Sequence, residues 1–197
     1  DDKEVVAGEK LDFDNNDVIL VSGGGSGIAA EATFAFAKKY PAKFILLGRE
    51  ELPENVESLA QLDEAGLEQL RQDVILELKS THDKVTPAMI NTEYDRLTKG
   101  IIVYNNVRRI KELGRKVLYL YCDVRGKECL KSQLAEAKSQ LGSITGLVHA
   151  AGIDKSHMLA QKSLDEFRQV FSVKVQGALN LFNLTKDEPL KFVVAFS

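Results

Sequence analysis

The sequence predicts an α/β fold in which a doubly wound parallel sheet carries helices on both faces. Two observations support this prediction. Short apolar runs, typical of strands buried on both faces, recur at 18–21, 44–47, 116–121, 144–148 and 191–197. Segments with helical spacing or helix-capping residues separate these runs, which is the alternation expected of a parallel sheet.

The composition is that of an ordinary globular domain. The 197 residues are 44% hydrophobic and 28% charged, enough for one domain with a well-formed core. The formal net charge of −3 gives no basic footprint for nucleic acid, and no apolar run has transmembrane length. Two cysteines, Cys122 and Cys129, and no apparent signal peptide favour a reducing, cytoplasmic setting. Small soluble ligands are therefore favoured over nucleic acid or membrane.

The chain divides into two parts by its patterning. Residues 1–16 are mostly polar without a strong period, and we interpret them as a lead-in or interdomain linker. Residues 17–197 are predicted to form one nucleotide-binding domain. Because the first residue is Asp and the last residues form an apolar run, we expect the chain to be a piece of a longer protein.

The stretch DVILVSGGGSGIAA at 17–30 combines a strand, a glycine turn and the start of a helix. Glycines at such a turn let the backbone approach a pyrophosphate, and the helix N-terminus offers N–H groups and a positive dipole end. No Gly-Lys-Ser/Thr follows, so this is not a P-loop. An ordinary tight turn is the alternative. The predicted cofactor-binding residues here are Ser22, Gly23, Gly25, Ser26, Gly27 and Ile28.

The second predicted strand ends in Gly48 and Arg49, which bear on the choice of nucleotide. An acidic residue at this place accepts hydrogen bonds from the ribose hydroxyls of NAD, whereas a 2′-phosphate needs a cation. Arg49 can form a charge-assisted, bidentate pair with phosphate, and we expect Gly48 to leave room for it. The sequence favours NADP(H), with a surface arginine of no such role as the alternative.

Residues 51–113, approximately, are predicted to form a helical hairpin inserted after the second strand. Leucines and valines at three- and four-residue spacing mark one helix over 63–79, and Thr86-Pro87 begins a second that ends near Gly114. The apolar stripe could dock on the parent domain, on a neighbouring domain or on a second copy, which would make a homodimer. No set of catalytic residues lies within the insertion.

Two further strand ends carry candidate ligand contacts. Ala150, Ala151 and Gly152 follow the fourth strand, and small residues there allow a cofactor to lie against the backbone. His149 is interpreted as a structural residue, because the sequence places neither a carboxylate nor a nucleophile beside it. Asp123, after the third strand, is by itself a strand-end turn residue.

A capping box, Ser163 with Glu166, predicts the start of the next helix. Its expected buried face contains Phe167, Val170, Phe171, Ala178 and Leu181. Lys174 lies on the same stripe, where a lysine is costly unless it is paired or used. Snorkelling of Lys174 to an edge is the alternative.

Five segments, 22–29, 46–49, 122–124, 149–152 and 173–178, occur in the order seen in ketoreductase domains of modular polyketide synthases and related polyunsaturated fatty acid synthases. The chain resembles this branch of the short-chain dehydrogenase/reductase superfamily over 17–197, apart from the insertion. His-Ala-Ala-Gly at 149–152 and Lys174 are the discriminating features, since stand-alone short-chain reductases usually have Asn-Asn-Ala-Gly and an asparagine there.

The resemblance implies a Rossmann-like fold, with Asp123 and Val124 at the adenine and Lys174 in a catalytic Lys-Ser-Tyr-Asn set. It places the catalytic serine, tyrosine and asparagine after Ser197, so we expect the 197 residues alone to be inactive. The implied reaction is NADPH-dependent reduction of a 3-ketoacyl chain, carried on an acyl carrier protein, to the 3-hydroxyacyl form. Other domains of the parent synthase would be partners, and no metal site is predicted. A free-standing reductase of a small ketone or sugar, or a non-catalytic structural subdomain, are the alternatives.

Overall fold

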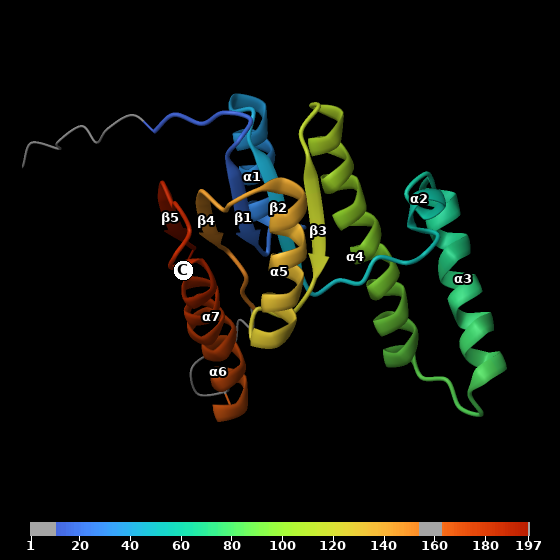
Figure 1. The fold of residues 1–197 in the computed structure, drawn as a ribbon. Helices are drawn as coiled ribbons and strands as arrows, with labels where there is room; N and C mark the ends of the chain where they lie inside the picture. The colour runs from blue at the N-terminus through green and yellow to red at the C-terminus, as the bar shows by residue number, and fades with distance from the viewer. Residues whose placement is uncertain (1–10, 154–162, 197) are drawn as a thin grey trace, which may run out of the picture.

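The chain is described over residues 11–153 and 163–196 in a computed structural model, and its centre is a five-stranded parallel sheet (Figure 1). The strand order is β3-β2-β1-β4-β5. The strands are β1 (Val18–Ser22), β2 (Lys43–Gly48), β3 (Val117–Tyr121), β4 (Gly146–His149) and β5 (Phe192–Ala195). The chain starts in the middle, runs to one edge and returns to the other side of β1. This reversal places the carboxyl ends of β1 and β4 side by side, where open α/β sheets bind ligands.

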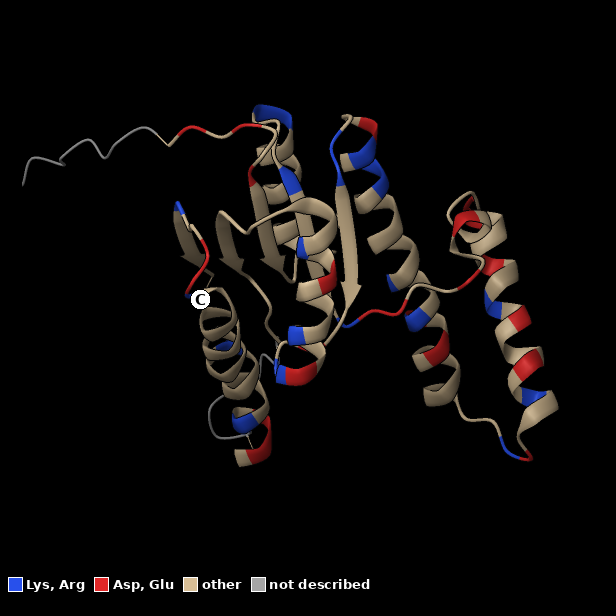
Figure 2. Cartoon of the chain, viewed as in Figure 1, with Lys and Arg blue, Asp and Glu red and all other residues tan. Residues whose placement is uncertain are grey.

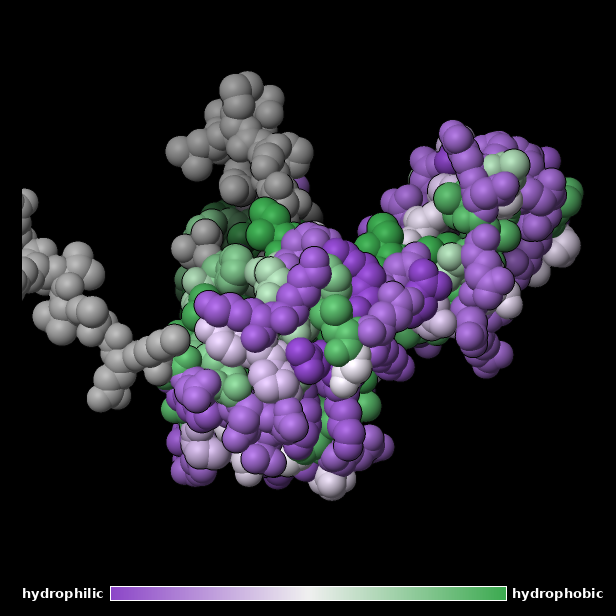
Figure 3. Space-filling model, turned by 90° about the horizontal axis from the view of Figure 1, so that it is seen from above, coloured by the Kyte–Doolittle hydropathy of each residue, from purple (hydrophilic) through white to green (hydrophobic). Residues whose placement is uncertain are grey.

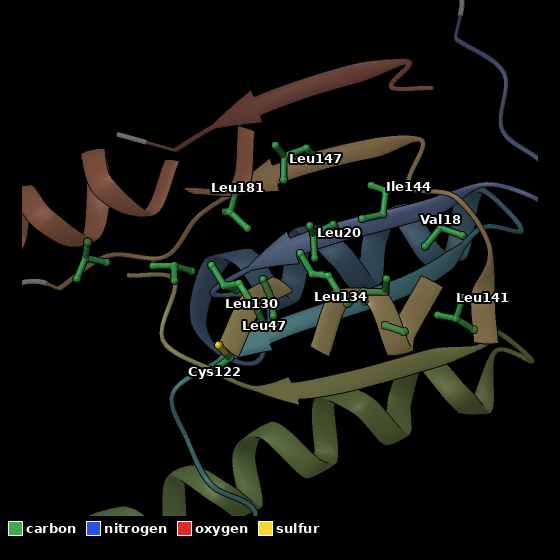
Figure 4. Close-up of a cluster of buried hydrophobic side chains, with 14 residues drawn as sticks. Val18, Leu20, Leu47, Cys122, Leu130, Leu134, Leu141, Ile144, Leu147 and Leu181 are labelled. Carbon is green, nitrogen blue, oxygen red and sulfur yellow. The ribbon is translucent and has the colours of Figure 1, made fainter. Parts of the chain in front are cut away.

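Helices cover both faces of the sheet, which confirms the predicted doubly wound, Rossmann-like fold. On one face lie α1 (Gly27–Lys39) and α4 (Pro87–Glu112), and on the other α5 (Lys127–Leu141) and α7 (Gly177–Thr185). Residues alternate along β1, so that Val18 and Leu20 pack on the α5 side (Figure 4) and Ile19 and Val21 on the α1 side.

The C-terminal half of α4 packs on the sheet, and its N-terminal half is part of a lobe that projects from the domain. Val103, Val107 and Ile110, in its C-terminal half, are buried in the core cluster on the α1 side. This half is therefore the crossover helix between β2 and β3, and the projecting part is smaller than the predicted insertion of 51–113. The sequence does not mark the division, because the helical periodicity continues without a break across it.

The projecting lobe contains α2 (Val56–Leu59), α3 (Glu64–Thr81) and the N-terminal half of α4 (Figure 1). Asp63 caps α3, and Thr86 caps α4 with Pro87 in the first turn, as the sequence predicted for the second helix. Residues 51–81, in this lobe, contain eight Asp or Glu and two Lys or Arg (Figure 2). The surface of the lobe that is seen from above is mainly hydrophilic (Figure 3).

The linker predicted for 1–16 does not extend to its last residues. Phe13 is buried, and its ring packs edge-on against Phe36, Tyr40 and Phe192. Residues 11–16 therefore belong to the folded domain, since an aromatic ring at position 13 has an apolar site to fill. Residues 1–10 and Ser197 lie outside the described residues.

The buried face predicted for the helix after Ser163 is wrong in its first half. The capping box is present at the start of α6 (Leu164–Phe171), but Phe167 and Phe171 are more than half exposed. A π-helical segment, Ser172–Gln176, joins α6 to α7. Its wider turn shifts the helical phase, so Val173, Gly177 and Leu181 form the buried face instead. None of the described helices is long and apolar enough to cross a membrane.

Candidate functional site

A cleft of about 750 Å³ lies at the carboxyl ends of the central strands. It is lined by every cofactor-binding residue predicted from the sequence except Ser22 and Asp123. Lys174 lines it from the π-helical segment, and Val103 and Tyr119 line it from α4 and β3. An apolar groove of about 570 Å³ between α1, β4 and β5 brings few polar groups together, so the cleft is the better candidate site.

The glycine turn after β1 rests directly on the backbone that follows β4. Gly23 has φ +75°, and a Cβ atom there would lie 2.8 Å from the Ala151 nitrogen and 2.9 Å from the Ala150 carbonyl. These neighbours are main-chain atoms that cannot turn aside, so only glycine fits. The two glycine- and alanine-rich loops predicted to contact a nucleotide are thereby held against each other.

The start of α1 is open to a ligand. Ser26 is the N-cap residue, in an extended conformation, and its side chain makes no capping hydrogen bond within the described helix. Gly27, with φ +61°, has no described atom within 4 Å of a Cβ position. Gly27, Ile28 and Ala29 of this first turn line the cleft, so the cleft lies at the positive end of the helix dipole, an arrangement that suits an anion.

His149 connects the glycine turn to the π-helical segment. Its Nδ1 lies 2.7 Å from the Ser22 hydroxyl, and its Nε2 lies 3.0 Å from the Lys174 carbonyl oxygen. Because a carbonyl only accepts, the network assigns the proton to Nε2, and the Ser22 hydroxyl donates to Nδ1. Ser22 in turn accepts a hydrogen bond from the Ala151 N–H at 3.3 Å. Ser22, which was predicted to bind the cofactor, is fully buried in this network and does not line the cleft.

The imidazole of His149 is buried and neutral. Burial lowers the pKa of His149 below its ordinary value, because the charged ring would lose its hydration. Both ring nitrogens are already hydrogen-bonded to protein atoms. These contacts support the structural interpretation made from the sequence.

Lys174 is half-buried with a fixed ammonium group. Its Nζ donates to the Phe196 carbonyl oxygen, just after β5, at 2.6 Å. A Cβ atom on Gly152 would lie 3.0 Å from the Lys174 Cε, so the side chain runs directly along the loop after β4. Lys174 thus does not snorkel to an outer edge but spans the gap between the ends of β4 and β5.

Arg49 lines the cleft with an exposed side chain, but Gly48 is required for a different reason from the one expected. A Cβ atom on Gly48 would lie 2.3 Å from the Tyr119 hydroxyl oxygen and 2.9 Å from the ring carbon Cε2. The space beside Gly48 is thus occupied by the Tyr119 side chain rather than left for a phosphate. The prediction missed this because Tyr119 is 71 positions away in the sequence.

Asp123 is engaged by a neighbouring arginine instead of lining the cleft. Arg125 donates from Nε and a terminal nitrogen to the Asp123 carboxylate, at 2.6–3.1 Å. These hydrogen bonds lower the pKa of Asp123, so the carboxylate stays charged. Val124, the next residue, does line the cleft.

Asn106 of α4 is a site residue that sequence reasoning missed. Its Nδ2 donates to the Gly25 carbonyl oxygen at 3.0 Å, and Val103 packs beneath Gly25, 3.1 Å from a Cβ position. Arg109 on the same helix forms a two-point ion pair with Glu31 of α1. No sequence signal pointed to these contacts, because this half of α4 was assigned to the insertion. Within residues 11–153 and 163–196, no cluster of three or more metal-ligating side chains occurs.

Comparisons with known proteins identify the family of the chain. The family model described as "KR domain" matches residues 18–197. The chain is 31% identical to a subunit of the polyunsaturated fatty acid synthase of Thraustochytrium sp. over 192 residues, which is 92% of this chain and 7% of that protein. It is 26% identical to polyketide synthase PksL of Bacillus subtilis over 192 residues, 96% of this chain and 4% of that protein.

Solved structures show the same fold. A ketoreductase domain from the bacillaene assembly line matches with a TM-score of 0.67 and 21% identity, over 99% of this chain and 36% of that one. An N-terminal ketoreductase from the macrolactin assembly line matches with a TM-score of 0.65 and 22% identity, over 95% and 30%. The resemblance stated from the sequence is confirmed, and the chain belongs to the KR, or ketoreductase, domain family.

Proposed function

We propose that the chain binds NADP(H) and forms the cofactor-binding part of a reductase that converts a 3-ketoacyl chain, carried on an acyl carrier protein, to the 3-hydroxyacyl form. One observation carries the proposal: a single cleft gathers the glycine turn, Arg49 and Lys174. The pyrophosphate would lie at the glycine turn and the start of α1. The 2′-phosphate would lie at Arg49, and the nicotinamide near Gly152 and Lys174.

The residues of the cleft fit such a cofactor. The glycine turn has no side chain at residues 23–25, and the open N-terminus of α1 suits the pyrophosphate charge. Arg49 is exposed, lines the cleft and offers a planar donor set for a phosphate on the ribose. Asp123, the nearby acid, is instead paired with Arg125.

NADPH, when bound, supplies a hydride to the keto carbon, and a proton completes the hydroxyl group. Lys174 would hold its ammonium charge beside this reaction. The positive charge favours the phenolate form of a neighbouring tyrosine, which the family pattern places after Ser197, and supports proton relay to it. The hydrogen bond to the Phe196 carbonyl fixes the position of that charge.

The matched synthases are far larger than this chain, which spans 7% and 4% of their lengths. We therefore propose an acyl carrier protein and the other domains of a synthase as the working partners. In this arrangement a tethered acyl chain is brought to the cleft rather than captured from solution.

The test is NADPH oxidation by the full-length protein, supplied with a 3-ketoacyl thioester on an acyl carrier protein. NADPH should be consumed and a 3-hydroxyacyl thioester formed, as measured by absorbance and by mass spectrometry. The matched saturated thioester, which lacks the keto group, is the control and should give no oxidation. Tight NADPH binding with no turnover on any ketoacyl thioester would support a non-catalytic role instead.

The choice of cofactor is tested by Arg49→Ala. The variant should bind NADPH more weakly by about 1.5–3 kcal/mol, the range for hydrogen bonds to charged groups, and should bind NADH almost as before. Isothermal titration calorimetry of both cofactors measures the difference. Arg108→Ala is the matched control, because Arg108 is exposed on α4, pairs with Glu112 and does not line the cleft, and it should leave the affinities for both cofactors unchanged. Equal losses for NADPH and NADH in Arg49→Ala would contradict the assignment.

A further inference from the structure

Tyr119 makes a two-point contact with the residue that follows Arg49. Its hydroxyl donates to the Glu50 carbonyl oxygen at 2.8 Å and accepts from the Glu50 N–H at 3.3 Å. The last register pair of β2 and β3 is Gly48 with Tyr121, so these bonds begin where the ladder between the strands ends. One side chain of β3 thus holds both main-chain polar groups of Glu50.

The ring of Tyr119 reaches the glycine turn as well. A Cβ atom on Gly25 would lie 3.2 Å from its Cε2, and a Cβ atom on Gly48 would lie 2.9 Å from the same carbon. The ring therefore separates the two loops that line this end of the cleft, and it lines the cleft itself. Its thickness sets the spacing between the glycine turn and the turn that carries Arg49.

We propose that Tyr119 is a positioning residue for selectivity toward a 2′-phosphorylated adenine nucleotide, because it fixes the Arg49 turn at a set distance from the glycine turn. This inference rests on the proposed function, since it takes Arg49 as the group that recognises the 2′-phosphate. Tyr119 acts through Arg49 and does not itself contact the phosphate.

The chemistry of the side chain fits this role. Burial raises the pKa of Tyr119 to about 12, so the phenol keeps its proton and continues to donate to Glu50 at any physiological pH. A turn that is fixed before binding loses less conformational entropy when Arg49 binds a 2′-phosphate. This lower entropic cost strengthens binding only of nucleotides that carry a 2′-phosphate. A tyrosine that merely filled the core would affect both kinds of nucleotide alike.

The experiment compares two small probes, 2′,5′-ADP and 5′-AMP, by calorimetry on the full-length protein. Tyr119→Phe keeps the ring and removes the two hydrogen bonds to Glu50. The dissociation constant for 2′,5′-ADP should rise by about fivefold or more, on the scale of net hydrogen-bond contributions, while that for 5′-AMP changes by less than about twofold. Tyr121→Phe is the matched control, because Tyr121 is on the same strand but is 52% exposed, and it should change neither constant.

A double variant tests whether Tyr119 acts through Arg49. In an Arg49→Ala background, Tyr119→Phe should cause no further loss of 2′,5′-ADP binding, since the coupled partner is gone. Equal losses for both probes, or a full additional loss in the double variant, would overturn the positioning role alone. A wild-type protein that binds the two probes equally well would overturn the NADP(H) assignment, and this inference with it.

Discussion

Replacing Lys174 with methionine is expected to lower the turnover of the proposed reduction, measured on the full-length protein, by about 10²- to 10⁴-fold, the range for a positioned acid–base group. Methionine keeps a long apolar side chain along Gly152 but has no ammonium to place near the reacting oxygen. The fold should survive, because the variant loses one hydrogen bond, to the Phe196 carbonyl, at a net cost of about 1 kcal/mol.

The measurement is NADPH oxidation with the 3-ketoacyl thioester, alongside the thermal unfolding midpoint and NADPH affinity. Lys186→Met is the control, since Lys186 is exposed at the end of α7, the helix that continues from the π-helical segment. Its turnover should match that of the wild type. Unchanged turnover in Lys174→Met would remove this lysine from the mechanism and leave the reductase proposal dependent on the cofactor cleft.

Gly23→Ala is expected to produce the largest loss of stability among the glycine variants of the site. A non-glycine residue in the left-handed region costs about 1–2 kcal/mol, and forcing a methyl group into occupied space adds about 1–3 kcal/mol. Here the obstructing atoms are the main chain of Ala150 and Ala151, at 2.8–2.9 Å. The free energy of unfolding should fall by about 2–5 kcal/mol, without any cofactor present.

Alanine variants of two other glycines with positive φ measure the conformational cost alone, without a steric clash. Gly27 and Gly114 have φ of +61° and +74°, and a Cβ atom at either position has no described neighbour within 4 Å. Alanine at these positions should therefore cost only the conformational term, about 1–2 kcal/mol, in urea denaturation. A Gly23→Ala variant no less stable than Gly114→Ala would show that the two loops move apart easily.

Much of the fold could be predicted because its signals are local. The apolar runs at the strands, the capping box at Ser163 and the cap at Thr86 each depend on residues within a few positions of one another. The failures arose where local patterns are ambiguous. The exposure of Phe167 and Phe171 depends on a π-helical turn that shifts the helical phase, and nothing in the spacing of apolar residues marks it.

The candidate site was likewise predicted where its signals are local and missed where its contacts are distant in sequence. The glycine turn and the small residues after β4 were found from composition, and the structure brings them into one cleft. Tyr119 and Asn106 were missed because they act on Glu50 and Gly25 from 69 and 81 positions away. Such contacts depend on which strands and helices become neighbours, and a single sequence does not state this.

The long helix α4 runs without a break from the projecting lobe to the cleft. Its 26 residues span about 39 Å, with one half held on the sheet and the other paired with α3. Each residue advances an α-helix by about 100° around its axis. A single residue added directly before Gly100 would therefore rotate the N-terminal half of α4 by about 100° relative to the half that packs on the sheet. The length of the N-terminal half of α4 therefore sets the direction in which the acidic lobe projects from the sheet.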